Sequence, residues 1–293
     1  MKGKTVLITG ATAGIGKAAA IELARRGADL ALVARNPDKA GTAVGEITTA
    51  APGTAVQVFR ADLADTSQVR AVADEITSQL GRIDVLVNNA GIAARRSRRT
   101  VDGYDEMFAA NYLGPFLLTH VLLDKVRSSA PARIVIVGSE AHRMAGTFDP
   151  ERFEQLDEYS GLGVQLAYGR TKLLDILFAD ELARRLDGSR ITVNSLCPGA
   201  VATELSREIG PGSSLGRLAS LTPFLRTPEQ GARMTVRLAS SPEVEGVTGR
   251  FFTSTPGAGL LPTVAARRDP AIAARVYERT CKLVGVDPVA AAR

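Results

Sequence analysis

Residues 5–23 read TVLITGATAGIGKAAAIEL, and this stretch decides the fold. The run from Thr5 to Ile8 is apolar and indicates a buried strand, whereas the run from Lys17 to Leu23 has helical spacing. Between them lies a turn with three glycines. A glycine turn in this position lets backbone N–H groups and the helix N-terminus approach a pyrophosphate. The stretch therefore predicts nucleotide binding by an α/β fold, with a chance turn as the alternative. The residues that we assign to the cofactor here are Gly10, Thr12, Ala13, Gly14, Ile15 and Gly16.

Strand-like runs and helical stretches alternate along the chain. Several of the runs are almost wholly apolar, which is typical of strands buried on both faces of a parallel sheet. The pattern predicts a doubly wound parallel sheet, a Rossmann fold, with helices on both faces. The expected strands are Thr5–Ile8, Leu30–Val33, Ala55–Phe59, Val85–Val87, Ile134–Val137 and Ile191–Leu196.

No linker or repeat divides the chain, so we expect a single domain over residues 1–293. After Pro198 the sequence becomes rich in glycine, proline and serine, and we expect a substrate-binding lid over about 200–230, beyond the sixth strand. Residues from about 256 to 293 form a C-terminal extension. Its segment 271–277 predicts an amphipathic helix that packs on the body or on a second subunit.

Composition excludes some classes of protein. The chain is 45% hydrophobic and 23% charged, as in globular domains, and no apolar stretch approaches the length of a membrane span. We expect no signal peptide and a cytoplasmic location. Cys197 and Cys281 lie far apart without metal-ligand spacing, so we expect free thiols and no metal site.

The formal net charge of +5 is modest and does not call for nucleic acid as a partner. The one dense basic run, residues 95–99, contains four arginines and no aromatic residue. A solvated loop explains this run, and contact with an acidic substrate or partner is the alternative.

The end of the second expected strand bears on the choice of cofactor. In this position a carboxylate would bind the ribose 2′-OH of NAD, whereas an arginine can pair with the 2′-phosphate of NADP. Arg35 and Asn36 stand here, which favours NADP over a generic surface arginine. Asp62, followed by Leu63, comes after the third strand and can accept a hydrogen bond from the adenine amino group. Lys17 could add positive charge or face solvent.

Tyr168 and Lys172 are four residues apart at the start of an apolar helical stretch, so both can point into one pocket. An unperturbed tyrosine has a pKa of about 10, and a neighbouring ammonium, helped by a positive nicotinamide ring, is expected to lower it. Ser139 ends the fifth expected strand, where its hydroxyl can meet a ligand, although strand-end serines are more often caps. His142 could serve as an acid or base, but we interpret it as a loop residue near the site.

Together, these features resemble the short-chain dehydrogenase/reductase family, in the family's order and over residues 1 to about 205. The resemblance implies that Tyr168 donates and accepts the proton, that Ser139 orients the substrate oxygen, and that Lys172 tunes the tyrosine and holds the nicotinamide ribose. It also implies that Asn111 supports a water beside Lys172. The cofactor site would further include Asn89, Ala90, Gly91, Pro198, Gly199, Val201 and Thr203.

The sequence gives an independent reason for the role of Asn111. We expect a helix over residues 107–126, and within it Pro115 cannot donate a hydrogen bond to the carbonyl four residues earlier. That carbonyl belongs to Asn111, so we hypothesise that it is free to hold the water. A carbonyl bonded within a regular helix would contradict this.

Within the family, the chain is most similar to retinol dehydrogenase-like, NADP-preferring members. The similar segments are residues 102–104, 111–114 and 139–142, and the long interval between Ser139 and Tyr168. Tyr112 stands where histidine is common in those members and Thr171 where serine is usual, and we expect no amino-terminal anchor. These departures leave the expected catalytic residues intact.

The leading hypothesis is an NADP(H)-dependent oxidoreductase that interconverts a ketone or aldehyde and an alcohol. A carbon–carbon double-bond reductase of the same family is an alternative, and a nonenzymatic NADP-binding redox sensor is another. The expected partner is a small carbonyl or alcohol substrate, hydrophobic or bulky, and the resemblance favours a homo-oligomer.

Overall fold

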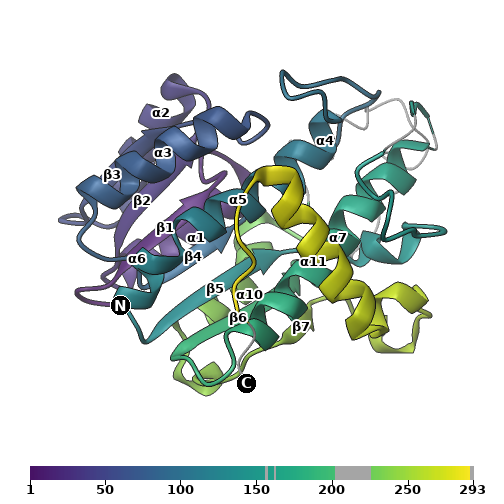
Figure 1. Cartoon of the computed structure of the whole chain (residues 1–293). Helices are drawn as coiled ribbons and strands as arrows, with labels where there is room; N and C mark the ends of the chain where they lie inside the picture. The colour runs from purple at the N-terminus through teal and green to yellow at the C-terminus, as the bar shows by residue number, and fades with distance from the viewer. Residues whose placement is uncertain (156–157, 162, 202–225, 291–293) are drawn as a thin grey trace.

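Seven parallel strands form one sheet in the part of the chain that the computed structural model describes, residues 1–155, 158–161, 163–201 and 226–290. The sheet order is β3-β2-β1-β4-β5-β6-β7, which confirms the predicted doubly wound sheet (Figure 1). The strands are β1 (Thr5–Thr9), β2 (Asp29–Ala34), β3 (Val56–Arg60), β4 (Val85–Asn88), β5 (Ala132–Val137), β6 (Ile191–Cys197) and β7 (Arg250–Thr253).

Helices cover both faces of this sheet and bury two apolar cores. One core lies under α1 (Gly14–Arg25), α2 (Pro37–Ala50) and α10 (Pro228–Ser240). The other is larger and lies under α3 (Thr66–Gln79), α5 (Gly114–Val121), α6 (Leu123–Ser128), α7 (Gly163–Arg185) and α11 (Pro270–Val284). The shorter helices are α4 (Glu106–Phe108), η1 (Ala109–Leu113), η2 (Glu140–Met144), η3 (Pro242–Val244), η4 (Ala258–Leu260) and η5 (Ala265–Arg268).

The strand order reverses between β1 and β4, since the chain builds outward to β2 and β3 on one side and to β5, β6 and β7 on the other. At such a point the connections leave in opposite directions and open a crevice at the carboxyl ends of the strands. The glycine turn after β1 and the segment after β4 therefore lie next to each other, and this juxtaposition positions the site.

All six expected strands are present, with ends that differ by one or two residues. A seventh strand, β7, was missed. It has four residues, lies at the edge of the sheet, and its residues are exposed or only partly buried, so it lacks the apolar run that marks the central strands.

The helix expected over 107–126 is not regular. Residues 109–113 form a π-helix between α4 and α5, and a further break after residue 121 separates α5 from α6. The π-helix lies directly before Pro115, whose missing N–H and ring disfavour a regular α-helical turn at this point.

The expected tail helix is α11, and it packs on the body of the same chain against α7 (Figure 1). Asp269 caps its start, and Gly285 ends it in the left-handed conformation, with φ of 63°. Val276 and Tyr277 are completely buried by this packing. Residues 285–290 follow α11, and we call this segment the strap. Arg185 of α7 holds it by donating to the Val289 carbonyl at 2.8 Å.

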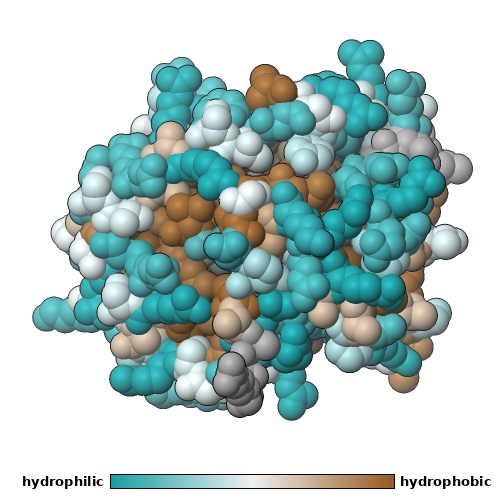
Figure 2. Space-filling model, in the orientation of Figure 1, coloured by the Kyte–Doolittle hydropathy of each residue, from teal (hydrophilic) through white to brown (hydrophobic). Residues whose placement is uncertain are grey.

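The face that carries this strap is hydrophilic over most of its periphery, and apolar residues gather in its middle (Figure 2). None of the helices in the described ranges is both long enough and apolar enough to span a bilayer.

Candidate active site

The glycine turn after β1 packs so tightly that side chains are excluded. Gly10 has φ of 69°, and a Cβ there would lie 2.8 Å from the Cα of Ala90. A Cβ on Gly16 would lie 2.4 Å from both the Asn89 amide nitrogen and the Gly10 carbonyl oxygen. Gly14 has φ of 54°, in the left-handed region that favours glycine. The turn therefore requires glycine at these three positions.

Helix α1 begins at Gly14, and its N-cap residue, Ala13, provides no side-chain hydrogen bond. By contrast, Asp65 caps α3 and Asn36 caps α2 through their side chains. The first N–H groups of α1 thus face the crevice without a capping side chain, and such a helix end attracts a phosphate through its N–H groups and dipole.

The end of β4 is tied to the glycine turn. The side-chain amide of Asn89 donates to the carbonyls of Thr9, at 3.0 Å, and Gly10, at 3.1 Å. In return, the Thr9 hydroxyl accepts from the N–H groups of Asn89 and Ala90, both at 3.0 Å. Asn89 therefore holds the two sides of the crevice together, a role that its position after the strand did not reveal.

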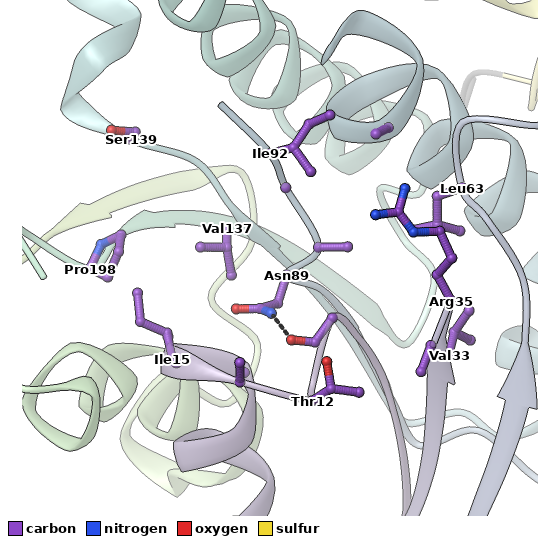
Figure 3. Close-up of a pocket in the computed structure, with 18 of the residues that line it drawn as sticks. Thr12, Ile15, Val33, Arg35, Leu63, Asn89, Ile92, Val137, Ser139 and Pro198 are labelled. Carbon is purple, nitrogen blue, oxygen red and sulfur yellow. Dashed lines mark hydrogen bonds between the residues drawn. The ribbon is translucent and has the colours of Figure 1, made fainter. Parts of the chain in front are cut away.

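A cleft of about 530 Å³ runs along the carboxyl ends of the strands. Figure 3 shows Arg35 and Leu63 at one end, Ser139 and Pro198 at the other, and Asn89 between them. Its length and lining suit an extended ligand with two chemically different ends. The predicted residues that line it are Gly10, Thr12, Ala13, Gly14, Ile15, Gly16, Arg35, Asn36, Asp62, Leu63, Asn89, Ala90, Gly91, Ser139, Tyr168, Lys172, Pro198, Gly199 and Val201.

At the first end, Arg35 follows β2, and its side chain is 64% exposed. Its guanidinium lies 3.3 Å from the carboxylate of Asp62, and Lys39 also lines this end of the cleft. Lys17 does not line the cleft; it forms an ion pair with Glu46 at 2.7 Å. A cationic group thus stands where a ribose phosphate would lie, and no carboxylate ends β2.

At the other end, Ser139 follows β5 and precedes η2. Its hydroxyl accepts from the Ala141 N–H at 3.1 Å, so the residue also caps η2, the ordinary role of a strand-end serine. His142 is completely buried, and its Nδ1 lies 2.8 Å from the Ser139 carbonyl oxygen. His142 belongs to η2 and does not line the cleft.

Tyr168 and Lys172 project from α7 into the same end of the cleft. The Lys172 ammonium lies 5.7 Å from the centre of the Tyr168 ring. It donates to the Val137 carbonyl at 3.1 Å and to the Asp175 carboxylate at 2.8 Å. Asp175 was missed by the sequence reasoning, although an acid in an otherwise apolar helical run was a visible signal.

Burial and charge act in opposite directions on the pKa of Tyr168. Burial raises it above its ordinary value, and the nearby Lys172 ammonium, which lowers it, does not outweigh this effect. Asp175 adds to the rise. Among the protein's own groups, burial therefore has the larger effect on the phenol, and it favours the protonated form.

Asn111 lies in the π-helix and is buried. Its side chain is occupied: Oδ1 accepts from the Ile92 N–H at 2.7 Å, and Nδ2 donates to the Ile92 carbonyl and to Thr171. The regular helical bond to its main-chain carbonyl is lost, since residue 115 is proline, and the N–H of Gly114 bonds to Ala109. The free carbonyl and the water that it would hold both stay predictions.

Among the described residues, one predicted site residue is not in the cleft lining. Asn111 does not line it, but its neighbour Ala110 does. Thr203 and most of the expected lid fall outside the described residues. Sequence reasoning also missed several residues of the lining: Val33, Ala34, Lys39, Ala61, Ile92, Ala110, Val137 and Gly138.

The residues present fit a dinucleotide. The glycine turn excludes side chains from its path, α1 offers uncapped N–H groups, and Arg35 provides a cation at the far end. By contrast, no group of histidine, cysteine and acidic residues within the described ranges could hold a metal ion. The cleft therefore places a titratable phenol, that of Tyr168, in the same lining as the glycine turn.

Comparisons with known proteins agree with this geometry. A sequence model for the family described as short chain dehydrogenase matches residues 4–150. Human retinol dehydrogenase 14 is 40% identical over 98% of this chain and 88% of its own length. Mouse retinol dehydrogenase 13 is 38% identical over 97% of this chain and 84% of its own length.

Solved structures share the fold. A dehydrogenase/reductase from Sinorhizobium meliloti 1021 has a TM-score of 0.69 at 30% identity, over 88% of this chain and 96% of that one. An uncharacterized protein from Mycobacterium paratuberculosis has a TM-score of 0.74, also at 30% identity, over 98% of this chain and 95% of that one.

Proposed function

The chain belongs to the short-chain dehydrogenase family of oxidoreductases, which use a nicotinamide cofactor, and from this premise we propose a specific activity. The protein is an NADP(H)-dependent enzyme that interconverts an aldehyde or ketone and an alcohol, with Tyr168 as its general acid and base. The single observation that carries the proposal is one cleft lined both by the glycine turn and by Ser139, Tyr168 and Lys172.

The proposed roles follow from position and chemistry. When bound, the cofactor supplies or accepts the hydride. The Tyr168 phenol protonates the oxygen of the reduced carbonyl and, in the reverse direction, takes the proton from the alcohol. The Ser139 hydroxyl is held at the end of β5, where it can orient the same oxygen. Lys172 holds its ammonium beside Tyr168 and is proposed to bind the nicotinamide ribose.

The preference for NADP is proposed from Arg35. Its exposed guanidinium lies at the adenosine end of the cleft, and its one described ion pair, with Asp62 at 3.3 Å, is long and easily exchanged. A 2′-phosphate offers a stronger, charge-assisted partner. The residues that directly follow β2 are Arg35 and Asn36, so the carboxylate that would bind the ribose 2′-OH of NAD is not present at the end of this strand.

Proton supply to Tyr168 is proposed to pass through Lys172 and a water held by the carbonyl of Asn111. Support comes from Pro115, which has no N–H to donate to this carbonyl, and from the closeness of Gly91 to the ammonium. A Cβ on Gly91 would lie 3.6 Å from the Lys172 nitrogen. The space there is small and polar, as a bridging water requires.

An apolar substrate is favoured by the surface next to Ser139 and Tyr168. Met144 ends η2 and is 43% exposed, and Leu166, two residues before Tyr168, is 47% exposed. Leu261 is 51% exposed, and Arg143 of η2 holds its segment by donating to the Leu261 carbonyl at 2.7 Å. Exposed large apolar side chains on the elements that carry Ser139 and Tyr168 favour an apolar substrate. The relatives named as retinol dehydrogenases point in the same direction.

The remaining expectations stay proposals. A homo-oligomer, a cytoplasmic location, a single domain over the whole chain and a lid over about 200–230 are each proposed from the sequence. A second subunit could not pack on the part of α7 that α11 of the same chain already covers.

The test is to measure turnover of carbonyl compounds by the purified protein. The purified protein is mixed with NADPH or NADH and with all-trans-retinal, decanal, benzaldehyde or cyclohexanone, and both cofactor oxidation and products are followed. The proposal expects an alcohol product from at least one apolar carbonyl compound, with NADPH preferred. Tight NADPH binding without turnover of any of these compounds would instead favour a redox sensor, and a saturated carbonyl product from an enone would favour double-bond reduction.

A further inference from the structure

Asp175 is a buried acid whose position the proposed function does not yet explain. It lies on α7 three residues after Lys172, and its carboxylate oxygen is 2.8 Å from the Lys172 ammonium. Both side chains are only 5% exposed. Removing a carboxylate and an ammonium from water is unfavourable unless their contact and further hydrogen bonds compensate for the lost hydration.

No structural duty accounts for this carboxylate. In the part of the chain that the structure describes, its one hydrogen bond or ion pair is with Lys172. Within the described ranges it caps no helix and bonds α7 to no other element, and its neighbours along the helix, Leu174 and Ile176, belong to the buried interior. An apolar residue would serve the packing at this place at least as well. The carboxylate therefore acts on Lys172.

Lys172 is held on two sides. Asp175 takes one N–H of the ammonium, and the Val137 carbonyl at the end of β5 takes another at 3.1 Å. The same ammonium faces the Tyr168 ring at 5.7 Å. With two of its three donors fixed, the long lysine side chain keeps one position beside the phenol instead of sampling several.

We propose that Asp175 is a positioning residue of the active site: it fixes the Lys172 ammonium against β5 and, as its counter-ion, limits how strongly that ammonium favours the ionised form of Tyr168. This inference rests on the proposed function, because it assumes that Tyr168 exchanges the proton. It adds that the site holds an ammonium–carboxylate pair beside the phenol rather than an isolated ammonium.

The titratable groups around the phenol are few. Lys172 and Asp175 face it from α7 and Cys197 from β6, while Tyr112 faces Asp175 from η1. Burial alone would lower the pKa of Lys172, but Asp175 reverses this and raises it. Burial raises the pKa of Asp175 to about 6, so above that pH both partners are charged. The paired carboxylate then opposes the effect of the ammonium on Tyr168.

The ammonium–carboxylate pair affects reduction and oxidation differently. Carbonyl reduction uses the protonated phenol, which is the form that burial and Asp175 favour at neutral pH. Alcohol oxidation begins with the phenolate, so its rate rises only in alkaline solution. Asp175 thus adapts the site to reduction.

The test is a titration of Tyr168 that needs no substrate. Tyrosinate absorbance is recorded against pH for the wild type and for Tyr168→Phe, and their difference gives the pKa of Tyr168. The same pair is measured in an Asp175→Asn background, since asparagine keeps the shape and can still accept from Lys172. We expect Asp175→Asn to lower the pKa of Tyr168 by about one pH unit, with and without NADP⁺.

Asp180→Asn is the matched control. Asp180 is another acid of α7, and it is partly buried. Its carboxylate interacts with Arg267 instead of Lys172, so removing this charge should leave the pKa of Tyr168 unchanged. Oxidation of benzyl alcohol by NADP⁺ gives a kinetic readout. In Asp175→Asn, the pH at which the oxidation rate rises should fall by the same amount as the pKa of Tyr168. A merely structural role would instead lower the rate equally at all pH values.

An unchanged pKa of Tyr168 in Asp175→Asn would overturn the proposal. Asp175→Ser is the second variant should the first not fold. A wild-type Tyr168 pKa well below the ordinary value would overturn it even without a folded variant, and a value at or above the ordinary one supports it. These outcomes are separate from failure of the proposed function, which would appear as wild-type turnover in Tyr168→Phe.

Discussion

Replacing Arg35 by glutamine should remove the preference for NADPH while leaving the binding of NADH unchanged. The guanidinium is 64% exposed and lies 3.3 Å from Asp62, so it can turn toward a 2′-phosphate by giving up one long ion pair. Hydrogen bonds to charged groups contribute about 1.5–3 kcal/mol, and an exposed ion pair about 0–1 kcal/mol. The difference is about 1–2 kcal/mol, or a roughly tenfold weaker Kd for NADPH.

The assay is a fluorescence titration of NADPH and of NADH with wild type and variant. Lys17→Gln is the matched control, because it removes the same charge from the same region but acts on an ion pair with Glu46 outside the cleft. Lys17→Gln should leave the Kd values of NADPH and NADH within twofold of wild type, apart from a small effect of net charge at low salt. Equal weakening of NADPH and NADH by Arg35→Gln, or no change in either, would refute the role of Arg35.

Two further predictions concern the turn and α7. Gly16→Ala places a Cβ 2.4 Å from the Asn89 amide and should destabilise the fold by about 1–3 kcal/mol and weaken NADPH binding, whereas Gly45→Ala, in open space on α2, should stabilise it slightly; urea unfolding and titration measure both. Unchanged stability of Gly16→Ala would show that the turn can relax. Burial raises the pKa of Asp180 from 3.8 to about 6, so the folded state binds its proton more tightly than the unfolded state. Wild type should therefore lose stability as pH rises through this window, and Asp180→Asn should lose less; parallel curves of unfolding free energy against pH would contradict this.

Much of the fold follows from local patterns in the sequence. The central strands are apolar on both faces, and the glycine turn has one geometry because Gly10 and Gly16 touch the end of β4. Hence six of the seven described strands, the turn and much of the cleft lining could be predicted before the structure. Strand β7 could not, because an edge strand of four residues is recognised only from its partner, β6.

The site was predictable as a set of residues but not as an electrostatic environment. A spacing of four on a helix placed Tyr168 and Lys172 together, yet the direction of the Tyr168 pKa depends on burial, which no spacing reports. The pairing of Asp175 with Lys172 depends on which side of α7 faces the interior. Pro115 predicted an irregular helix, but the π-helix that accommodates it became visible only in three dimensions.

The most direct test of the account is the turnover of Tyr168→Phe with NADPH and the apolar aldehyde or ketone that the wild type reduces fastest. The variant keeps the ring and loses the hydroxyl that is proposed to transfer the proton. We predict a fall in kcat of at least about 100-fold, with the Kd of NADPH unchanged. A kcat within twofold of wild type would contradict the assignment of Tyr168 as the general acid and base.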